Sequence, residues 1–119
     1  MRRAVALPAV LAGVVLLGAT PALAGSHKPQ KKRVEVGDNF YAPSKLTVKP
    51  RTKIVWRWPA EAGDVHDVKL QAGPKHVRKF HSEPAAGGYT YNRKLTVPGL
   101  YKIVCTLHEE MKMTITVRR

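Results

Sequence analysis

The sequence predicts an all-β sandwich of about seven to eight short strands. Apolar residues alternate with polar ones over several short runs, and Gly, Pro, Asn or Asp stands between the runs. No stretch keeps the apolar period of a helix for three turns. With 119 residues, the chain is long enough for one compact domain and argues against two.

The expected strands follow one another with turns between them. Turns are expected at 37–39, 49–52 and 98–99, where Gly, Pro, Asn and Asp cluster. Ile54, Trp56 and Trp58 share one face of the third strand. The long segment 71–88 is expected to be an irregular connection. In chain order, the strands are expected at 34–36, 46–48, 53–58, 65–70, 89–97, 100–105 and 113–117.

The first 24 residues have the pattern of a secretory signal peptide. Arg2 and Arg3 give a positive start, residues 4–19 are apolar, and Ala22-Leu23-Ala24 matches a cleavage site. The apolar run is too short, and too interrupted by Pro and Gly, for a typical membrane span. An uncleaved membrane anchor is the alternative to a signal peptide. We therefore expect an exported protein, in the periplasm, in the cell envelope or secreted, with no stable membrane span after cleavage. Residues 25–33 are expected to form a flexible basic arm, and residues 34–119 the folded domain.

One short segment near the end of the chain contains several metal-binding side chains. Cys105, His108 and Met111 lie between two expected strands, and His66 lies at the start of an earlier one. A lone Cys in an exported chain could pair with another chain, lie in the core or bind a metal. Two imidazoles, a thiolate and a weaker thioether favour copper in a trigonal site with a long axial bond.

These residues belong to a wider set of motifs. The chain resembles the cupredoxins, the type 1 blue copper proteins, and within them the plastocyanin, pseudoazurin and amicyanin group. The motifs that carry the resemblance are Phe40-Tyr41-x-Pro43, Leu46-x-Val48, Val55-Trp56, Val65-His66-Asp67-Val68, Pro98-Gly99-x-Tyr101 and Cys105-x-x-His108-x-x-Met111.

The resemblance implies an eight-stranded Greek-key sandwich that holds one type 1 Cu(I)/Cu(II) ion. It implies that His66 and His108 supply imidazole nitrogens, Cys105 the thiolate and Met111 the axial sulfur. The implied function is to carry single electrons, with the edge of His108 as the exit and Leu107 in a small apolar contact patch. Four protein ligands leave no open position for a substrate, so we expect no enzyme. A copper-binding or copper-delivery protein without an electron-transfer role is the alternative.

Two methionines compete for the axial position. Placing the ligand at Met111 aligns Ile115 and Val117 with the two Val positions of the family motif x-Gly-x-Val-x-Val. Placing it at Met113 puts Arg119 on an apolar position. The alignment favours Met111 as the ligand and Met113 as a core or rim residue.

Three acidic residues depart from the family pattern. Asp67 stands where Asn usually ties the two ligand-bearing segments together, and a carboxylate cannot donate the amide protons. Glu109 and Glu110 lie inside the ligand loop, where their negative charge is expected to favour Cu(II) and lower the reduction potential.

The remaining histidines have other expected roles. Cleavage after Ala24 would place His27 third in the chain, where an amine, two amide nitrogens and an imidazole can form a second, square-planar Cu(II) site. A disordered tail residue is the alternative. His76 and His81 lie in the charged connection and are expected to be solvent-exposed, without partners at ligand spacing.

The chain carries 21 Lys and Arg against 8 Asp and Glu, a net charge of +13. For an electron carrier, this charge predicts a redox partner with an acidic docking surface, and an anionic cell surface is the alternative. Export and the lack of a recognition motif argue against nucleic acid. We expect a monomer that meets its partner briefly.

Overall fold

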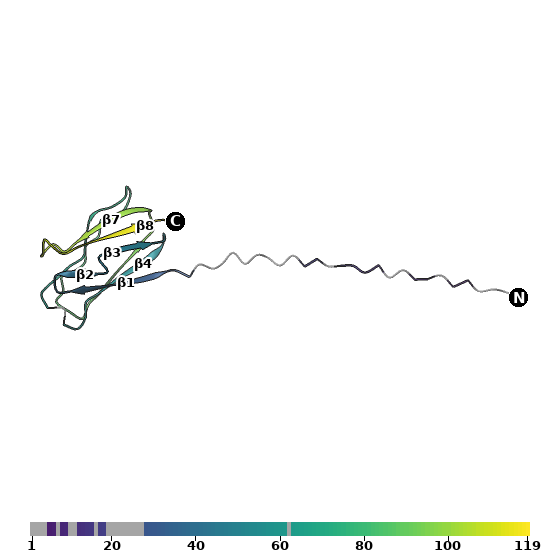
Figure 1. Cartoon of the computed structure of the whole chain (residues 1–119), viewed down its shortest axis with the longest axis horizontal. Helices are drawn as coiled ribbons and strands as arrows, with labels where there is room; N and C mark the ends of the chain where they lie inside the picture. The colour runs from purple at the N-terminus through teal and green to yellow at the C-terminus, as the bar shows by residue number, and fades with distance from the viewer. Residues whose placement is uncertain (1–4, 7, 10–11, 16, 19–27, 62) are drawn as a thin grey trace.

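The computed structural model describes residues 5–6, 8–9, 12–15, 17–18, 28–61 and 63–119. Two four-stranded sheets pack face to face, and the described residues contain no helix (Figure 1). The expected all-β sandwich is therefore confirmed. Within the same residues, no helix is long and apolar enough to cross a membrane. His27 and the predicted cleavage site lie outside the described residues.

The sheets are mixed in strand direction. One sheet has the order β2-β1-β4-β6 and the other the order β3-β8-β7-β5. β1 pairs in parallel with β4, and β3 in parallel with β8, while every other pair is antiparallel. The strands are β1 (Lys31–Gly37), β2 (Phe40–Ala42), β3 (Lys45–Val48), β4 (Thr52–Arg57), β5 (Lys69–Ala72), β6 (Thr90–Leu95), β7 (Gly99–Val104) and β8 (Lys112–Val117).

The core lies between the inward faces of the two sheets. Ile54 and Trp56 point inward from β4, as the alternation predicts, and Trp58 continues this buried row. β8 alternates buried and half-buried residues from Met113 to Val117. Burial of such apolar side chains, at about 25 cal/mol per Å², is the main force that joins the sheets.

The strand directions give the domain two distinct ends. The loop end comprises the β1–β2 turn (38–39), the segment 58–68 and the segment 105–111. The terminal end comprises 28–30, 49–51, 95–98 and 118–119. Because β1 and β4 run in parallel and β7 runs antiparallel to β8, the starts of β1, β4 and β7 and the end of β8 all lie at the terminal end. Figure 1 shows the C-terminus at this end of the domain.

Two predicted boundaries are corrected by the structure. The strand expected at 65–70 is misplaced, because β5 spans Lys69–Ala72 and His66 forms only an isolated bridge with Ala85. β1 begins at Lys31 and pairs with Lys53 on β4, so the last three residues of the expected arm lie in a strand. β2 is a short strand that the alternation did not predict.

Candidate metal site

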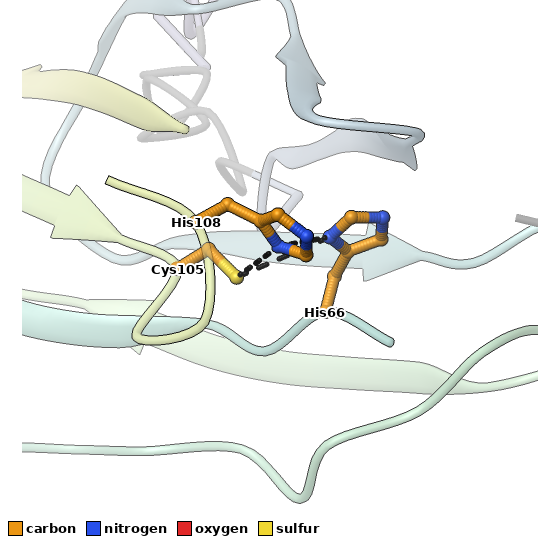
Figure 2. A group of neighbouring side chains, drawn as sticks. All are labelled: His66, Cys105 and His108. Carbon is orange, nitrogen blue, oxygen red and sulfur yellow. Dashed lines mark hydrogen bonds between the residues drawn. The ribbon is translucent and has the colours of Figure 1, made fainter. Parts of the chain in front are cut away.

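Three of the predicted ligands lie together at the loop end. The Nδ1 atoms of His66 and His108 are 3.1 Å apart, and the Cys105 Sγ lies 4.0 Å from the first and 3.6 Å from the second (Figure 2). His66 and Cys105 are buried, while the His108 side chain is 22% exposed. The structure thus brings a thiol and two imidazoles to one point.

Backbone hydrogen bonds position each of these side chains. His66 exchanges two hydrogen bonds of 2.9 Å with Ala85, and these fix its segment without a regular strand. The Cys105 N–H donates to the Met111 carbonyl at 3.0 Å, and the Met111 N–H donates to the His108 carbonyl at 3.1 Å. The ligand loop therefore closes on itself between β7 and β8.

The three donors fit a single metal ion. Bonds from a first-row metal measure about 2.0 Å to imidazole nitrogen and about 2.3 Å to thiolate sulfur. Two donors of one ion can then lie at most about 4.0 Å apart for two nitrogens and about 4.3 Å for nitrogen and sulfur. All three observed separations fall within these limits.

The two candidate methionines have different surroundings. Met111 is buried at the end of the ligand loop, where its backbone joins the hydrogen bonds of Cys105 and His108. Met113 lies one step along β8, and its Sδ accepts a hydrogen bond of 3.3 Å from the Trp56 indole N–H. The Met113 sulfur is therefore engaged in the core.

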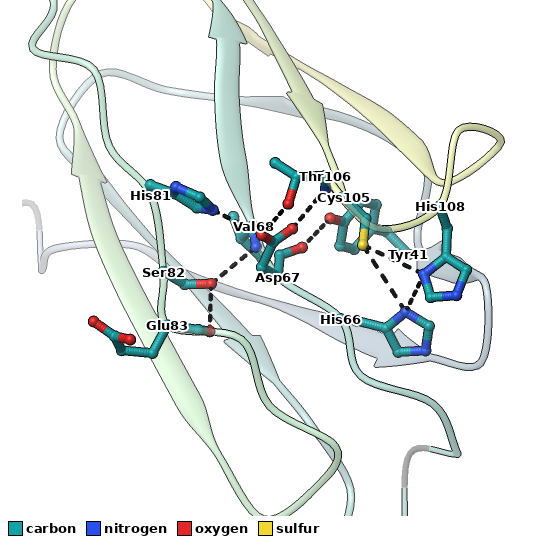
Figure 3. Close-up of polar contacts among 10 residues, drawn as sticks. All are labelled: Tyr41, His66, Asp67, Val68, His81, Ser82, Glu83, Cys105, Thr106 and His108. Atoms are coloured by element: carbon teal, nitrogen blue, oxygen red, sulfur yellow. Dashed lines mark hydrogen bonds and ion pairs between the residues drawn. The ribbon is translucent and has the colours of Figure 1, made fainter.

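Asp67 ties the two ligand-bearing segments together as an acceptor. Its Oδ1 accepts the Thr106 N–H at 2.7 Å, and its Oδ2 accepts the Thr106 hydroxyl (Figure 3). Burial by itself raises the pKa of Asp67, but hydrogen bonds from His81 and Thr106 outweigh that effect and hold the pKa below its usual range. Asp67 thus joins the two segments as an ionised hydrogen-bond acceptor, where an Asn side chain would also donate.

His81 corrects one sequence prediction. Its side chain is 48% exposed, as expected, but it does have a partner, because its Nε2 lies 2.7 Å from Asp67 Oδ2. Sequence spacing gave no signal for this contact, because the irregular connection carries His81 to the site by tertiary folding alone. His76 is exposed.

Two further carboxylates face the outer nitrogens of the histidines. Asp64 Oδ2 lies 3.2 Å from His108 Nε2. Asp38 Oδ1 lies 3.4 Å from His66 Nε2, a buried nitrogen that has no hydrogen-bond partner in the described residues. A hydrogen bond from the Val65 N–H, followed by the one from His108, holds the pKa of Asp64 below its usual range. The sequence analysis missed both aspartates, whose only signal was their place in turns.

Tyr41 closes the inner side of the site. Its hydroxyl donates to the Asp67 carbonyl and is buried. Burial, followed by the nearby negative charges of Cys105 and Asp67, raises the pKa of Tyr41 far above its usual value. Tyr41 therefore remains a neutral donor that supports the backbone beside His66.

Comparison with known proteins agrees with this geometry. The model of copper binding proteins of the plastocyanin/azurin family matches residues 30–118. No protein of curated function matches the sequence closely enough to count as a relative.

Several solved structures share the fold. A reduced Cu(I) form of an amicyanin variant at pH 4 gives a TM-score of 0.63 at 20% identity, over 78% of this chain and 87% of amicyanin. A second reduced amicyanin variant gives 0.64 at 22% identity over the same shares of the two chains. A copper-containing nitrite reductase from Thermus scotoductus SA-01 gives 0.64 at 22% identity, over 85% of this chain and 26% of the reductase.

Proposed function

The chain belongs to the plastocyanin/azurin family of copper binding proteins, and from this premise we propose that it is an exported electron carrier. The observation that carries the proposal is the cluster of His66, Cys105 and His108. The family and this donor set make the cofactor a type 1 copper ion. When bound, the copper accepts and releases one electron by cycling between Cu(II) and Cu(I). Export is supported by the N-terminal sequence pattern alone.

His108 offers the path by which an electron would leave. It is the only one of the three clustered donors that reaches the surface. Beside it, Leu107 is 53% exposed, and Phe40 and Val65 at the same end are 46% and 39% exposed. Such apolar residues suit a small, transient contact with a redox partner.

We propose Met111 as the fourth, axial ligand. Its position at the end of the ligand loop supports this role, and the hydrogen bond from Trp56 to Met113 argues against the alternative. With four protein donors the copper would have no open position for a substrate, which supports an electron carrier over an enzyme.

The placement of charges changes the expected partner. Six of the eight acidic residues lie at the loop end, against four basic residues next to it, Lys45, Arg57, Lys69 and Lys112. The six are Asp38, Glu61, Asp64, Asp67, Glu109 and Glu110. Asp67 is buried, but the other five are exposed, and a partner that contacts His108 meets these five carboxylates first. We therefore propose a basic or neutral docking surface on that partner.

Copper titration combined with electron exchange tests the proposed function. Adding Cu(II) to the copper-depleted chain should produce an intense thiolate-to-copper absorption band that saturates at one equivalent. Cys105→Ser and His66→Ala should abolish the band, while His76→Ala should retain it, because His76 is exposed and outside the cluster. Mixtures of oxidised and reduced protein should then exchange electrons rapidly, as seen in NMR line widths.

The same experiment separates the alternative of copper delivery. An electron carrier should keep its copper in the presence of a strong chelator for much longer than electron exchange takes. A normal band combined with slow exchange and rapid copper loss would overturn the electron carrier and favour delivery. Absence of the band would overturn both.

A further inference from the structure

A basic hollow lies at the terminal end, away from the copper site. Its volume is about 720 Å³, and five cationic side chains line it: Lys28, Lys49, Arg51, Lys94 and Arg119. They come from the segment before β1, the β3–β4 turn, β6 and the chain end. We refer to these five residues as the basic hollow.

These positive charges have no negative partners in the part of the chain that the structure describes. Within residues 28–61 and 63–119, every ion pair involves a histidine, and no Lys or Arg lies within ion-pair distance of Asp or Glu. Like charges gathered in this way repel one another, so the arrangement costs stability unless an anion neutralises it.

The backbone holds the hollow in place. The Arg51 N–H donates to the Leu95 carbonyl at 2.8 Å, and the Lys53 N–H donates to the Gln30 carbonyl at 2.8 Å. The Arg118 N–H donates to the Val48 carbonyl at 3.0 Å. These bonds join the four segments that carry the cations, so the charges are presented together on a fixed scaffold.

The surroundings of the hollow fit a charged surface better than a protein partner. No large apolar side chain lines it, whereas the centre of a protein interface is apolar. An electron-transfer partner bound here would be separated from the copper site by the length of β4, roughly 20 Å at 3.3 Å per residue. The exposed apolar residues Phe40, Val65 and Leu107 lie at the loop end, and the exposed Leu100 of β7 does not line the hollow.

We propose that the basic hollow binds the surface of an anionic phospholipid bilayer, with lipid phosphates as the ligands. Bound in this way, the domain directs its loop end, with the copper site, away from the bilayer. Each Lys or Arg close to such a surface strengthens binding roughly fivefold, and the attraction falls off within a Debye length.

Vesicle binding tests this proposal. The copper-loaded chain is mixed with vesicles of pure phosphatidylcholine, or of phosphatidylcholine with an equal amount of phosphatidylglycerol, and sedimented. Binding should be strong only to the vesicles with phosphatidylglycerol. Because Arg2 and Arg3 also favour anionic lipid, the site is assigned by variants that all share the same N-terminal segment.

Two sets of variants with equal loss of charge locate the site. Lys49→Gln, Lys94→Gln and Arg119→Gln together should weaken binding roughly a hundredfold. Lys45→Gln, Lys69→Gln and Lys112→Gln together, at exposed positions away from the hollow, should weaken it less than about threefold. The blue absorption band verifies that each variant remains folded and loaded.

Three results would overturn the proposal. The first is equal binding to both kinds of vesicle, and the second is an equal loss of binding in the two sets of variants. The third is binding of soluble polyphosphate as tightly as of the vesicles, which would indicate a general polyanion site. The orientation is tested separately. If the copper site faces away from the bilayer, a neutral hydroquinone should reduce bound and free protein at the same rate.

Discussion

At the scale of single residues, Asp67 shows how one departure from a family pattern can be compensated. A carboxylate accepts hydrogen bonds but donates none, and each donor around Asp67 matches that property. Thr106 supplies an N–H and a hydroxyl, and His81 supplies a ring N–H. The segments that carry His66 and Cys105 are therefore joined through a different set of atoms.

The roles of the two methionines can be separated by paired substitutions. Met111→Leu should raise the reduction potential and alter the visible spectrum, because an axial thioether tunes a site of this kind. Met113→Leu should leave the potential almost unchanged but lower the free energy of unfolding by about 1 kcal/mol, because Trp56 loses its acceptor. Voltammetry and urea unfolding measure the two effects, and the reverse pattern would identify Met113 as the ligand.

The carboxylate of Asp64 should lower the reduction potential of the copper. It faces the outer nitrogen of His108, where negative charge favours Cu(II) over Cu(I). Asp64→Asn should therefore raise the potential by something on the order of tens of mV. Glu109→Gln is the matched control, and it should give a smaller rise because Glu109 forms no ion pair with His66 or His108. A potential that stays constant or falls in Asp64→Asn contradicts this mechanism.

The meeting of His66, Cys105 and His108 could be predicted from sequence, but their supporting partners could not. Cys105 and His108 lie close together in the chain, and their chemical types restrict the choice of metal. Asp38, Asp64 and His81 reach the site only because separate turns meet in the folded molecule. No local pattern records such meetings.

At the scale of elements, β7 is fixed at both of its ends. Its last residue leads into Cys105, and near its start Tyr101 is buried and donates a hydrogen bond of 2.6 Å to the Val97 carbonyl. This bond attaches the β6–β7 connection to the strand that delivers the copper thiolate.

The Tyr101 hydroxyl should make stability depend on alkaline pH. Burial raises the pKa of Tyr101, so the folded chain keeps this proton after the unfolded chain has lost it above about pH 10. Tyr101→Phe should cost about 1 kcal/mol at neutral pH, from the lost hydrogen bond. The difference in free energy of unfolding between Tyr101→Phe and the unsubstituted protein should narrow as the pH rises past about 10, because only the protein with Tyr101 is then destabilised.

Urea unfolding at neutral pH and at about pH 11 measures this change. Tyr89→Phe is the control, since the Tyr89 hydroxyl makes no hydrogen bond within the described residues. If the two proteins differ in free energy of unfolding by the same amount at both pH values, the interpretation is contradicted.

Most strands could be predicted because alternation survives wherever a strand has one buried face. One exception was the segment 65–70, of which only Lys69 and Leu70 pair in a sheet, while His66 is held by its bridge with Ala85. The connection expected at 71–88 is irregular only from residue 73 onward, because residues 71 and 72 belong to β5. Its Phe80 nevertheless packs in the core, where the centroids of the Phe80 and Trp56 rings are 6.1 Å apart. A pattern search over regular elements does not detect such a contact.

At the scale of the whole molecule, the net charge could be read from the sequence but its distribution could not. The excess of cations predicted an anionic partner. Only the strand directions show that carboxylates gather around the copper and that the basic hollow lies at the opposite end. The two ends therefore suit partners of opposite charge.

The same separation of charge makes the molecule a permanent electric dipole along its strands. Near any charged surface such a dipole experiences a torque, which turns one chosen end forward before contact. The torque acts only within about one Debye length, about 8 Å at physiological ionic strength. Salt concentration therefore governs how often a collision begins in the productive orientation, even where the contact itself is apolar.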